Sequence, residues 1–307
     1  MSEELKEKKI DLEIKRAAQL SVTEIGIGSL GHGFKIPLTG QVLSLNQLAF
    51  LLNALNSDAL PRSAVFEISG IAALLKSFSP AGQKLGPMLS ISTQGFLFWL
   101  GISVFGTNFF GQILGAILLS LWAFIQPLIT LFFIYGFDLV NVMNFYLKRL
   151  NDDYAFIASS IGYAVIALLT VKMSIAVVFV FYSLAKKTKL TLIRESKFSS
   201  QILSQIPKGS QKNAAKAAFF DLFKPLFLFS FLLMFVFVCT IDASLSQKIW
   251  LTLRPVASAF LLFYVLRSQW VGEKMINFSR KSKTFERIYL KSKTALDLIS
   301  TKFSQND

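Results

Sequence analysis

The chain has 307 residues, 53% of them hydrophobic, and its mean hydropathy of +0.54 is well above that of ordinary soluble domains. Phenylalanine alone supplies 31 residues, which a lipid-facing surface can use but a soluble core does not need. The net charge is +14, yet the basic clusters flank apolar runs, a pattern that favours membrane topology over nucleic-acid binding. The sequence therefore predicts a membrane protein without a nucleic-acid partner.

The apolar runs predict an all-α, polytopic membrane helix bundle, because a span needs about 20 mostly apolar residues. The first 16 residues mix acids and bases and lack the apolar centre of a signal peptide, so we expect a cytoplasmic amphipathic segment there. Eight candidate spans follow, at 17–34, 41–56, 63–78, 87–105, 109–136, 155–185, 218–241 and 248–266. The first two are weakly hydrophobic, and the last four carry the strongest signal.

Lysine and arginine collect at the N-terminus, after the sixth span and in the C-terminal tail, and an even number of spans separates these clusters. All three then lie on one side, which the positive-inside rule makes the cytoplasm. We therefore predict a protein of the cell (inner, cytoplasmic) membrane with both termini in the cytoplasm. The predicted parts are a cytoplasmic segment (1–16), a six-span substrate-binding domain (17–186), a basic linker (187–217), a two-span extension (218–266) and a basic tail (267–307).

This topology places three polar connections on the outer side, at about 32–41, 79–88 and 137–153. They are rich in hydrogen-bonding groups, proline and glycine, whereas the inner connections before the sixth span are short. Three such connections on one face indicate a site that opens to the outside.

Three ionisable residues fall inside predicted spans, namely Glu24, Glu67 and Lys172. A lysine at the centre of a span costs about 2.5–3.5 kcal/mol, so we expect Lys172 to have a partner. That partner is either an anionic group of a ligand or one of the two glutamates. Alternatively, the lysine reaches the nearer membrane surface.

Other polar residues in and near the spans complete the predicted site. Gln94 is either part of a pocket wall or a contact between helices, and His32, the only histidine, is expected to bond backbone in a loop. The predicted substrate-binding residues are Thr39, Gln41, Asn46, Lys84, Gln94, Trp99 and Lys172. Small residues at a spacing of four, such as Gly111 and Gly115, predict close helix contact.

Catalytic and metal-binding motifs are not found in the sequence. It has no phosphate-binding loop, no paired-histidine zinc motif and no nucleophile elbow, and the single cysteine, Cys239, lies in an apolar run. We therefore expect no enzymatic activity, no metal and no cofactor. A membrane enzyme of lipid metabolism would need a catalytic cluster that the sequence does not display.

The segment "IPLTGQVLSLNQLAFLL", residues 36–52, resembles the biotin-type S components of energy-coupling-factor (ECF) transporters. The pattern of spans over about 15–186 is similar as well, with a cytoplasmic N-terminus and a first span rich in small residues. The stretch "SPAGQKLGPMLSISTQG" departs from the biotin-type pattern, which leaves the substrate open.

The resemblance implies a membrane-embedded substrate-capture subunit for vitamin uptake. Such a subunit binds a small, vitamin-like molecule, anionic or neutral, from the outer side and relies on a transmembrane T component and cytoplasmic ATPases. It also implies that Ala17, Ser21 and Gly28 contact the T component and that Lys172 lies near a ligand carboxylate.

Residues 187–307 extend beyond the resemblance. Their tail predicts an amphipathic helix on anionic lipids, a binding element for a cytoplasmic partner, or a solvated charged segment. The alternative function is a multi-pass membrane scaffold or assembly protein that acts through this linker and tail.

Overall fold

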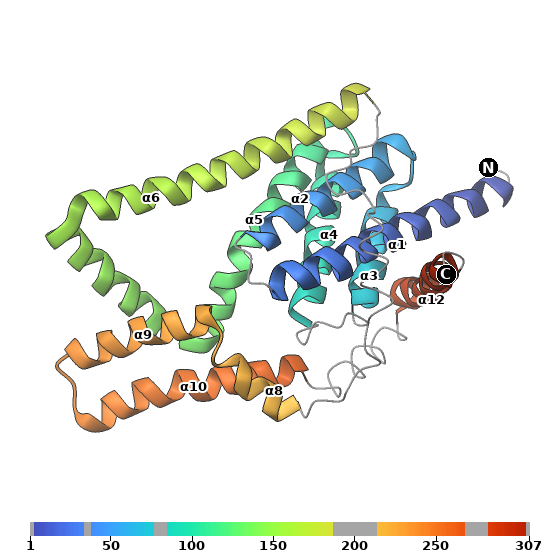
Figure 1. Ribbon diagram of the computed structural model, residues 1–307. Coiled ribbons are helices and arrows are strands. Elements are labelled where there is room, and N and C mark those ends of the chain that lie inside the picture. The colour runs from blue at the N-terminus through green and yellow to red at the C-terminus, as the bar shows by residue number, and fades with distance from the viewer. Residues whose placement is uncertain (1–2, 34–37, 77–84, 187–213, 268–281, 305–307) are drawn as a thin grey trace. The chain divides into compact units, whose positions relative to one another are not determined.

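The structure is a computed structural model that describes residues 3–33, 38–76, 85–186, 214–267 and 282–304. All elements in these ranges are helical, which confirms the predicted all-α class (Figure 1). The chain forms two compact units. Unit 1 comprises residues 1–124, 171–210 and 272–307, and unit 2 comprises residues 125–170 and 211–271. The predicted tail is thus divided between the units.

Unit 1 is built around the short helix α3. It contains α1 (Glu3–Gly33), α2 (Thr39–Leu52), the π-helix η1 (Asn53–Ser57), α3 (Arg62–Leu75), α4 (Leu85–Phe105), the first part of α5 (Phe109–Tyr135), the end of α6 (Asp138–Lys186) and α12 (Lys283–Ser304). Helix α3 contacts α1, α4 and α12, and most of its residues are buried. Pro61 precedes α3 in an extended conformation and starts it, because its fixed φ suits the residue before a helix.

An ion pair fixes α1 to the turn that follows η1. Arg16 Nε lies 2.5 Å from Asp58 Oδ2, and Arg16 Nη2 lies 3.0 Å from Asp58 Oδ1. Such a bidentate pair holds both side chains in one geometry. Arg16, which the sequence placed in a basic cytoplasmic cluster, is therefore part of the interior of unit 1.

Helices α4 and α5 approach closely, as the spacing of Gly111 and Gly115 predicted. Gly106, at φ 84°, makes the tight turn between them, a conformation that glycine adopts without strain. A Cβ atom on Gly115 would lie 2.7 Å from the ring and the carbonyl oxygen of Phe98. Only a residue without a side chain allows this approach, so the prediction of close packing is confirmed.

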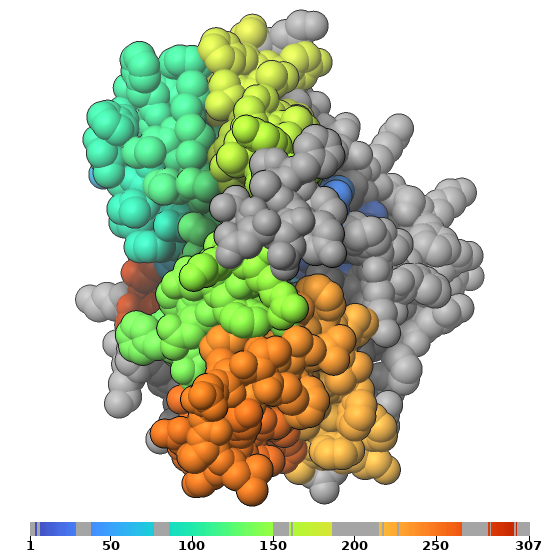
Figure 2. Space-filling model, turned by 90° about the vertical axis from the view of Figure 1, so that its left-hand side faces the viewer, coloured from blue at the N-terminus to red at the C-terminus, as the bar shows by residue number. Residues whose placement is uncertain are grey.

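Unit 2 contains the remainder of α5 and α6 together with α8 (Ala214–Asp221), α9 (Pro225–Thr240) and α10 (Leu245–Arg267). The start of α6 lies beside α9 and α10 (Figure 2). Tyr146 donates to the carbonyl of Leu233 over 2.8 Å. Arg254 pairs with Asp138 and donates to the carbonyl of Tyr135 over 2.9 Å, which satisfies the C-terminal end of α5.

Four described helices are long and apolar enough to cross a membrane, namely Gly86–Phe105, Phe109–Tyr135, Gly162–Ala185 and Leu245–Val265. A membrane protein is therefore supported, but the count of eight spans is not confirmed. The first three predicted spans form helices that are too short or too polar. The predicted span 218–241 is broken between α8 and α9, because the residue before Pro225 disfavours helical backbone.

The predicted polar connection at 137–153 is also helical, which corrects the expectation of a loop. Gly136, at φ 60°, ends α5 in the left-handed conformation, and α6 begins directly at Asp138. An acidic residue in the first turn favours a helix start through the helix dipole. The polar residues of this stretch therefore do not form a loop above a pocket.

The close contact of α4 and α5 makes Gly115 intolerant of a side chain. We expect Gly115→Leu to lower the stability by about 1–3 kcal/mol, because the new side chain must displace Phe98 and its backbone. Gly162→Leu is the matched control, since nothing lies within 4 Å of a Cβ atom there. Apparent melting temperatures of both variants in detergent check this, and equal values would contradict it.

Candidate functional site

Lys172 of α6 is buried in unit 1, with 4% of its surface exposed. Its ammonium donates to Oε1 of Gln41 and lies 4.9 Å from the centre of the Phe124 ring. Gln41 comes from α2 and Phe124 from α5, so three helices meet at this point. Both contacts are uncharged, and among the described residues no carboxylate pairs with Lys172.

Two other lysines of unit 1 lie near carboxylates: Lys76, which is fully buried, and Lys291, whose side chain is 12% exposed. Lys76, 1% exposed, donates to the Glu24 carbonyl, and its ammonium and the Glu24 carboxylate both lie beside Gly28. Lys291 pairs with Glu13 and Glu67. Of the two glutamates that the sequence offered as internal partners of Lys172, Glu67 pairs with Lys291, and the Glu24 carboxylate lies near Lys76. A buried ammonium without a countercharge is costly, which distinguishes Lys172 from its neighbours.

Gln41 links the lysine to α5. Its Nε2 donates to the carbonyl of Ala123 over 3.2 Å, while its Oε1 accepts from Lys172. The amide therefore has a defined orientation, with its oxygen turned to the cation. One amide oxygen satisfies only one of the three ammonium hydrogens, so Lys172 keeps capacity for further acceptors.

Asn46 lies further along α2, about 7.5 Å from Gln41 along the helix axis at the usual rise per residue. It is 1% exposed, and neither its Nδ2 nor its Oδ1 has a hydrogen-bond partner. The neighbouring Gln47 donates to Ser69 and to the Ile91 carbonyl, but its Oε1 has no partner. Leaving buried polar atoms unpaired costs about 1–3 kcal/mol each, so a bound group that pairs with them would be stabilised.

Two atoms on α5 share this property and were not among the predicted site residues. Trp122 Nε1 and Ser120 Oγ are buried without partners. Trp122 directly precedes Ala123 and Phe124, which contact Gln41 and Lys172. No polarity pattern in the apolar run of α5 indicates these residues, because a tryptophan in a span is ordinarily lipid-facing or part of a core.

The other predicted site residues have different surroundings. Gln94 donates to Ser90 of its own helix over 3.2 Å, and Trp99 packs against Phe66 and Phe96. Thr39 begins α2. None of these contacts involves Lys172. Lys84 lies outside the described residues, as does the side chain of His32, whose backbone belongs to α1.

The residues predicted to contact a T component face the interior of unit 1. Ala17 and Ser21 are fully buried, and a Cβ atom on Gly28 would lie 3.2 Å from both Leu43 and the Lys76 ammonium. Their role in docking stays a prediction. In this structure they allow α1 to approach its own neighbours closely.

Gln112 illustrates a glutamine that connects helices, as polar residues inside spans often do. It exchanges hydrogen bonds with Asn56 over 2.8 and 2.9 Å, and Asn56 also donates to Ser183.

Within the described ranges, no group of three or more His, Cys, Asp or Glu residues could hold a metal ion.

Comparison of the chain with protein-family models, with curated proteins and with solved structures found no match.

Lys172 has no carboxylate partner among the described residues, whereas Lys291 has two. Replacing each lysine with methionine should therefore change the stability in opposite directions. We expect Lys172→Met to raise the stability of the ligand-free protein by about 1–3 kcal/mol, because methionine fills the volume without a buried charge. The matched Lys291→Met should lower it by about 3–5 kcal/mol, because two buried carboxylates lose their partner. Apparent melting temperatures in detergent measure both, and a loss in Lys172→Met as large as in Lys291→Met would contradict the assignment.

Proposed function

We propose that this protein is the membrane-embedded substrate-capture subunit of a small-molecule importer, similar to the S components of ECF transporters. In this proposal it binds a small, vitamin-like organic anion from the outer side of the cell membrane. A separate transmembrane T component and cytoplasmic ATPases supply the energy. Both termini lie in the cytoplasm, where the basic segments collect.

The observation that carries the proposal is the uncompensated ammonium of Lys172. Its surroundings are an amide oxygen and an aromatic ring, which orient a cation without neutralising it. An anionic ligand group would provide the missing charge in a site of low dielectric constant, where such a contact is strong. Gln41 accepts only one of the three ammonium hydrogens, so the other two are available to acceptors of the ligand.

The alternative, a scaffold that acts through its basic linker and tail, has less support. Residues 187–213 and 268–281 lie outside the described ranges, and the described tail helix, α12, packs against α1 and α3 of its own chain. A tail that serves only to recruit partners would not need a buried apolar face.

A ligand screen tests the proposal. The full-length protein in lipid nanodiscs would be heated with a panel of small carboxylates, phosphate esters and neutral vitamins, and any stabilising compound would be titrated by calorimetry. We expect an anion to bind the wild-type protein and to bind Lys172→Met at least ~100-fold more weakly, because an anion then lacks its buried cation.

Lys148→Met is the control, because Lys148 is exposed on α6. It should bind the same compound with unchanged affinity. The proposal fails if no compound of the panel stabilises the protein, or if Lys172→Met and the wild-type protein bind it equally well.

A further inference from the structure

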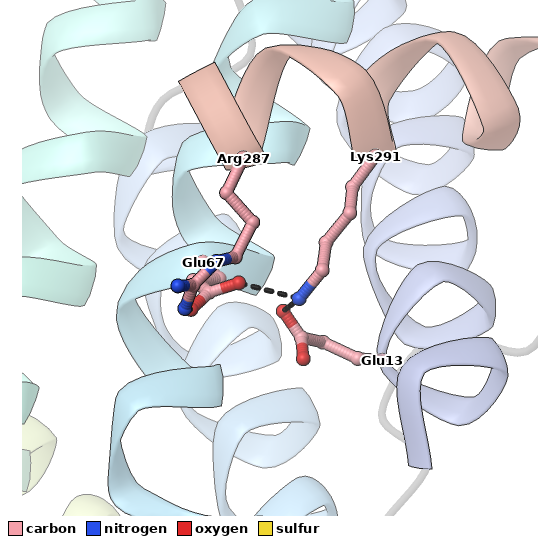
Figure 3. Close-up of polar contacts among 4 residues, drawn as sticks. All are labelled: Glu13, Glu67, Arg287 and Lys291. Atoms are coloured by element: carbon pink, nitrogen blue, oxygen red, sulfur yellow. Dashed lines mark hydrogen bonds and ion pairs between the residues drawn. The ribbon is translucent and has the colours of Figure 1, made fainter. Parts of the chain in front are cut away.

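Four charged residues join three helices of unit 1 where α12 crosses α1 and α3 (Figure 3). Lys291 of α12 lies 2.8 Å from Glu13 of α1 and 2.5 Å from Glu67 of α3. Arg287, one turn earlier on α12, lies 3.4 Å from the other oxygen of Glu67 and is largely exposed. A single ammonium thus contacts carboxyl groups from two different helices.

Apolar contacts seat α12 on the same face. Ile288, 1% exposed, fills the notch that Gly70 of α3 leaves, and its Cδ1 lies 3.0 Å from the place of a Cβ atom on Gly70. The rings of Phe285 and Phe66 meet edge to face at 6.4 Å. Ala295 continues this buried strip. The register of α12 is therefore set by one aliphatic side chain in a notch and one charge three residues later.

The position of Lys291 shows what this face of α12 is suited to contact. It lies between Ile288 and Ala295, in the middle of the apolar strip, at the spacing of successive helix turns. A helix that only lies on lipid keeps its apolar face free of charge and carries its lysines on the opposite face. A lysine at this place instead fits a protein surface with acidic groups.

We infer that α12 is a releasable clasp that Lys291 holds on α1 and α3, and that its release lets these two helices separate. When α12 leaves, the carboxylates of Glu13 and Glu67 face each other without a cation and repel. The uncovered face, a notch beside two acids, accepts a helix with an aliphatic residue three positions before a lysine. In the resting protein, α12 is that helix.

The clasp packs on one side only: Ile288, Ala295 and Ile299 are buried where α12 contacts α1 and α3, whereas its other side remains at the surface. Leu290 remains 58% exposed although it lies one position from Lys291. By contrast, α3 buries residues along most of its length. Peripheral elements that pack on one side only open at lower free energy than the core, so α12 is suited to release.

Glu13 makes the clasp sensitive to pH. Burial, with a contribution from the Glu67 carboxylate, raises the pKa of Glu13 from 4.5 to about 7, although Lys291 opposes the shift. The charged groups that face it are Glu67 from α3 and Lys291 from α12, while Arg287 contacts Glu67. Once α1 and α3 have separated, Glu13 is in water with its ordinary pKa of 4.5, so docked Glu13 binds a proton more tightly than released Glu13. This contribution to docking is complete below about pH 4.5 and is lost as the pH rises through about 7.

Cysteine labelling of the full-length chain tests the inference. In a Cys239→Ser background, Ala295→Cys reports the buried face of α12, and Leu290→Cys is the exposed reference on the same helix. The ratio of their rates with a water-soluble maleimide measures docking independently of thiol ionisation. We expect Lys291→Met to raise the relative rate of Ala295→Cys at least ~10-fold, which corresponds to a tenfold lower equilibrium constant for the docking of α12.

The pH dependence provides a second measurement. The relative rate of Ala295→Cys should increase several-fold from pH 6 to pH 8, and Glu13→Gln should remove most of this increase because residue 13 no longer titrates. An excess of a synthetic peptide of residues 282–304 should also raise the rate by competing for the face.

Release must be distinguished from unfolding. Ala49→Cys, buried on α2, should stay protected in the Lys291→Met protein if only α12 leaves. The inference is overturned if Ala49→Cys and Ala295→Cys become reactive together, since α12 is then a fixed part of the fold. It is equally overturned if Lys291→Met leaves Ala295→Cys protected.

Discussion

An ammonium group that leaves water needs a compensating charge, and the arrangement of unit 1 depends on how this need is met. Lys291 meets it with Glu13 and Glu67 from two other helices. Lys76 donates to the Glu24 backbone carbonyl and lies near the Glu24 carboxylate, so these contacts connect α1, α3 and α12. A buried pair of this kind adds little net stability, but it is destabilising to break and it specifies which helices lie together. Lys172 meets the need only in part, through an amide and an aromatic ring. The same requirement thus specifies which helices lie together at Lys291 and leaves ammonium hydrogens without an acceptor at Lys172.

Much of the fold could be predicted from hydrophobic periodicity and the positions of glycine. The all-α class, the turn at Gly106 and the close contact at Gly115 follow from local sequence, because span length and backbone approach are local constraints. The number of spans could not be predicted in this way. Helices such as α2 and α3 are apolar because they are buried inside the protein, and composition alone does not distinguish burial in protein from burial in lipid.

Those residues of the candidate site whose burial costs free energy could be predicted from the sequence. Lys172 and Gln41 are polar groups in apolar segments, and they meet although 131 positions separate them. Trp122 was missed because its ring is ordinary in a span, and only the tertiary packing leaves its nitrogen without a partner. The docking of α12 was missed for a similar reason. An amphipathic basic helix suits lipid as well as protein, and the acids that select protein lie more than 200 positions away in the sequence.

The group that contacts the ammonium of Lys172 in the protein isolated from its membrane tests the proposed function most directly. An experimental density map would show this group, provided that the full-length protein is purified without any step that removes bound ligands. We expect density for a small non-protein molecule with an anionic group within hydrogen-bond distance of the Lys172 nitrogen, beside Gln41 and Phe124. A carboxylate of the chain itself at that nitrogen would contradict it, because Lys172 would then be one more internally paired lysine.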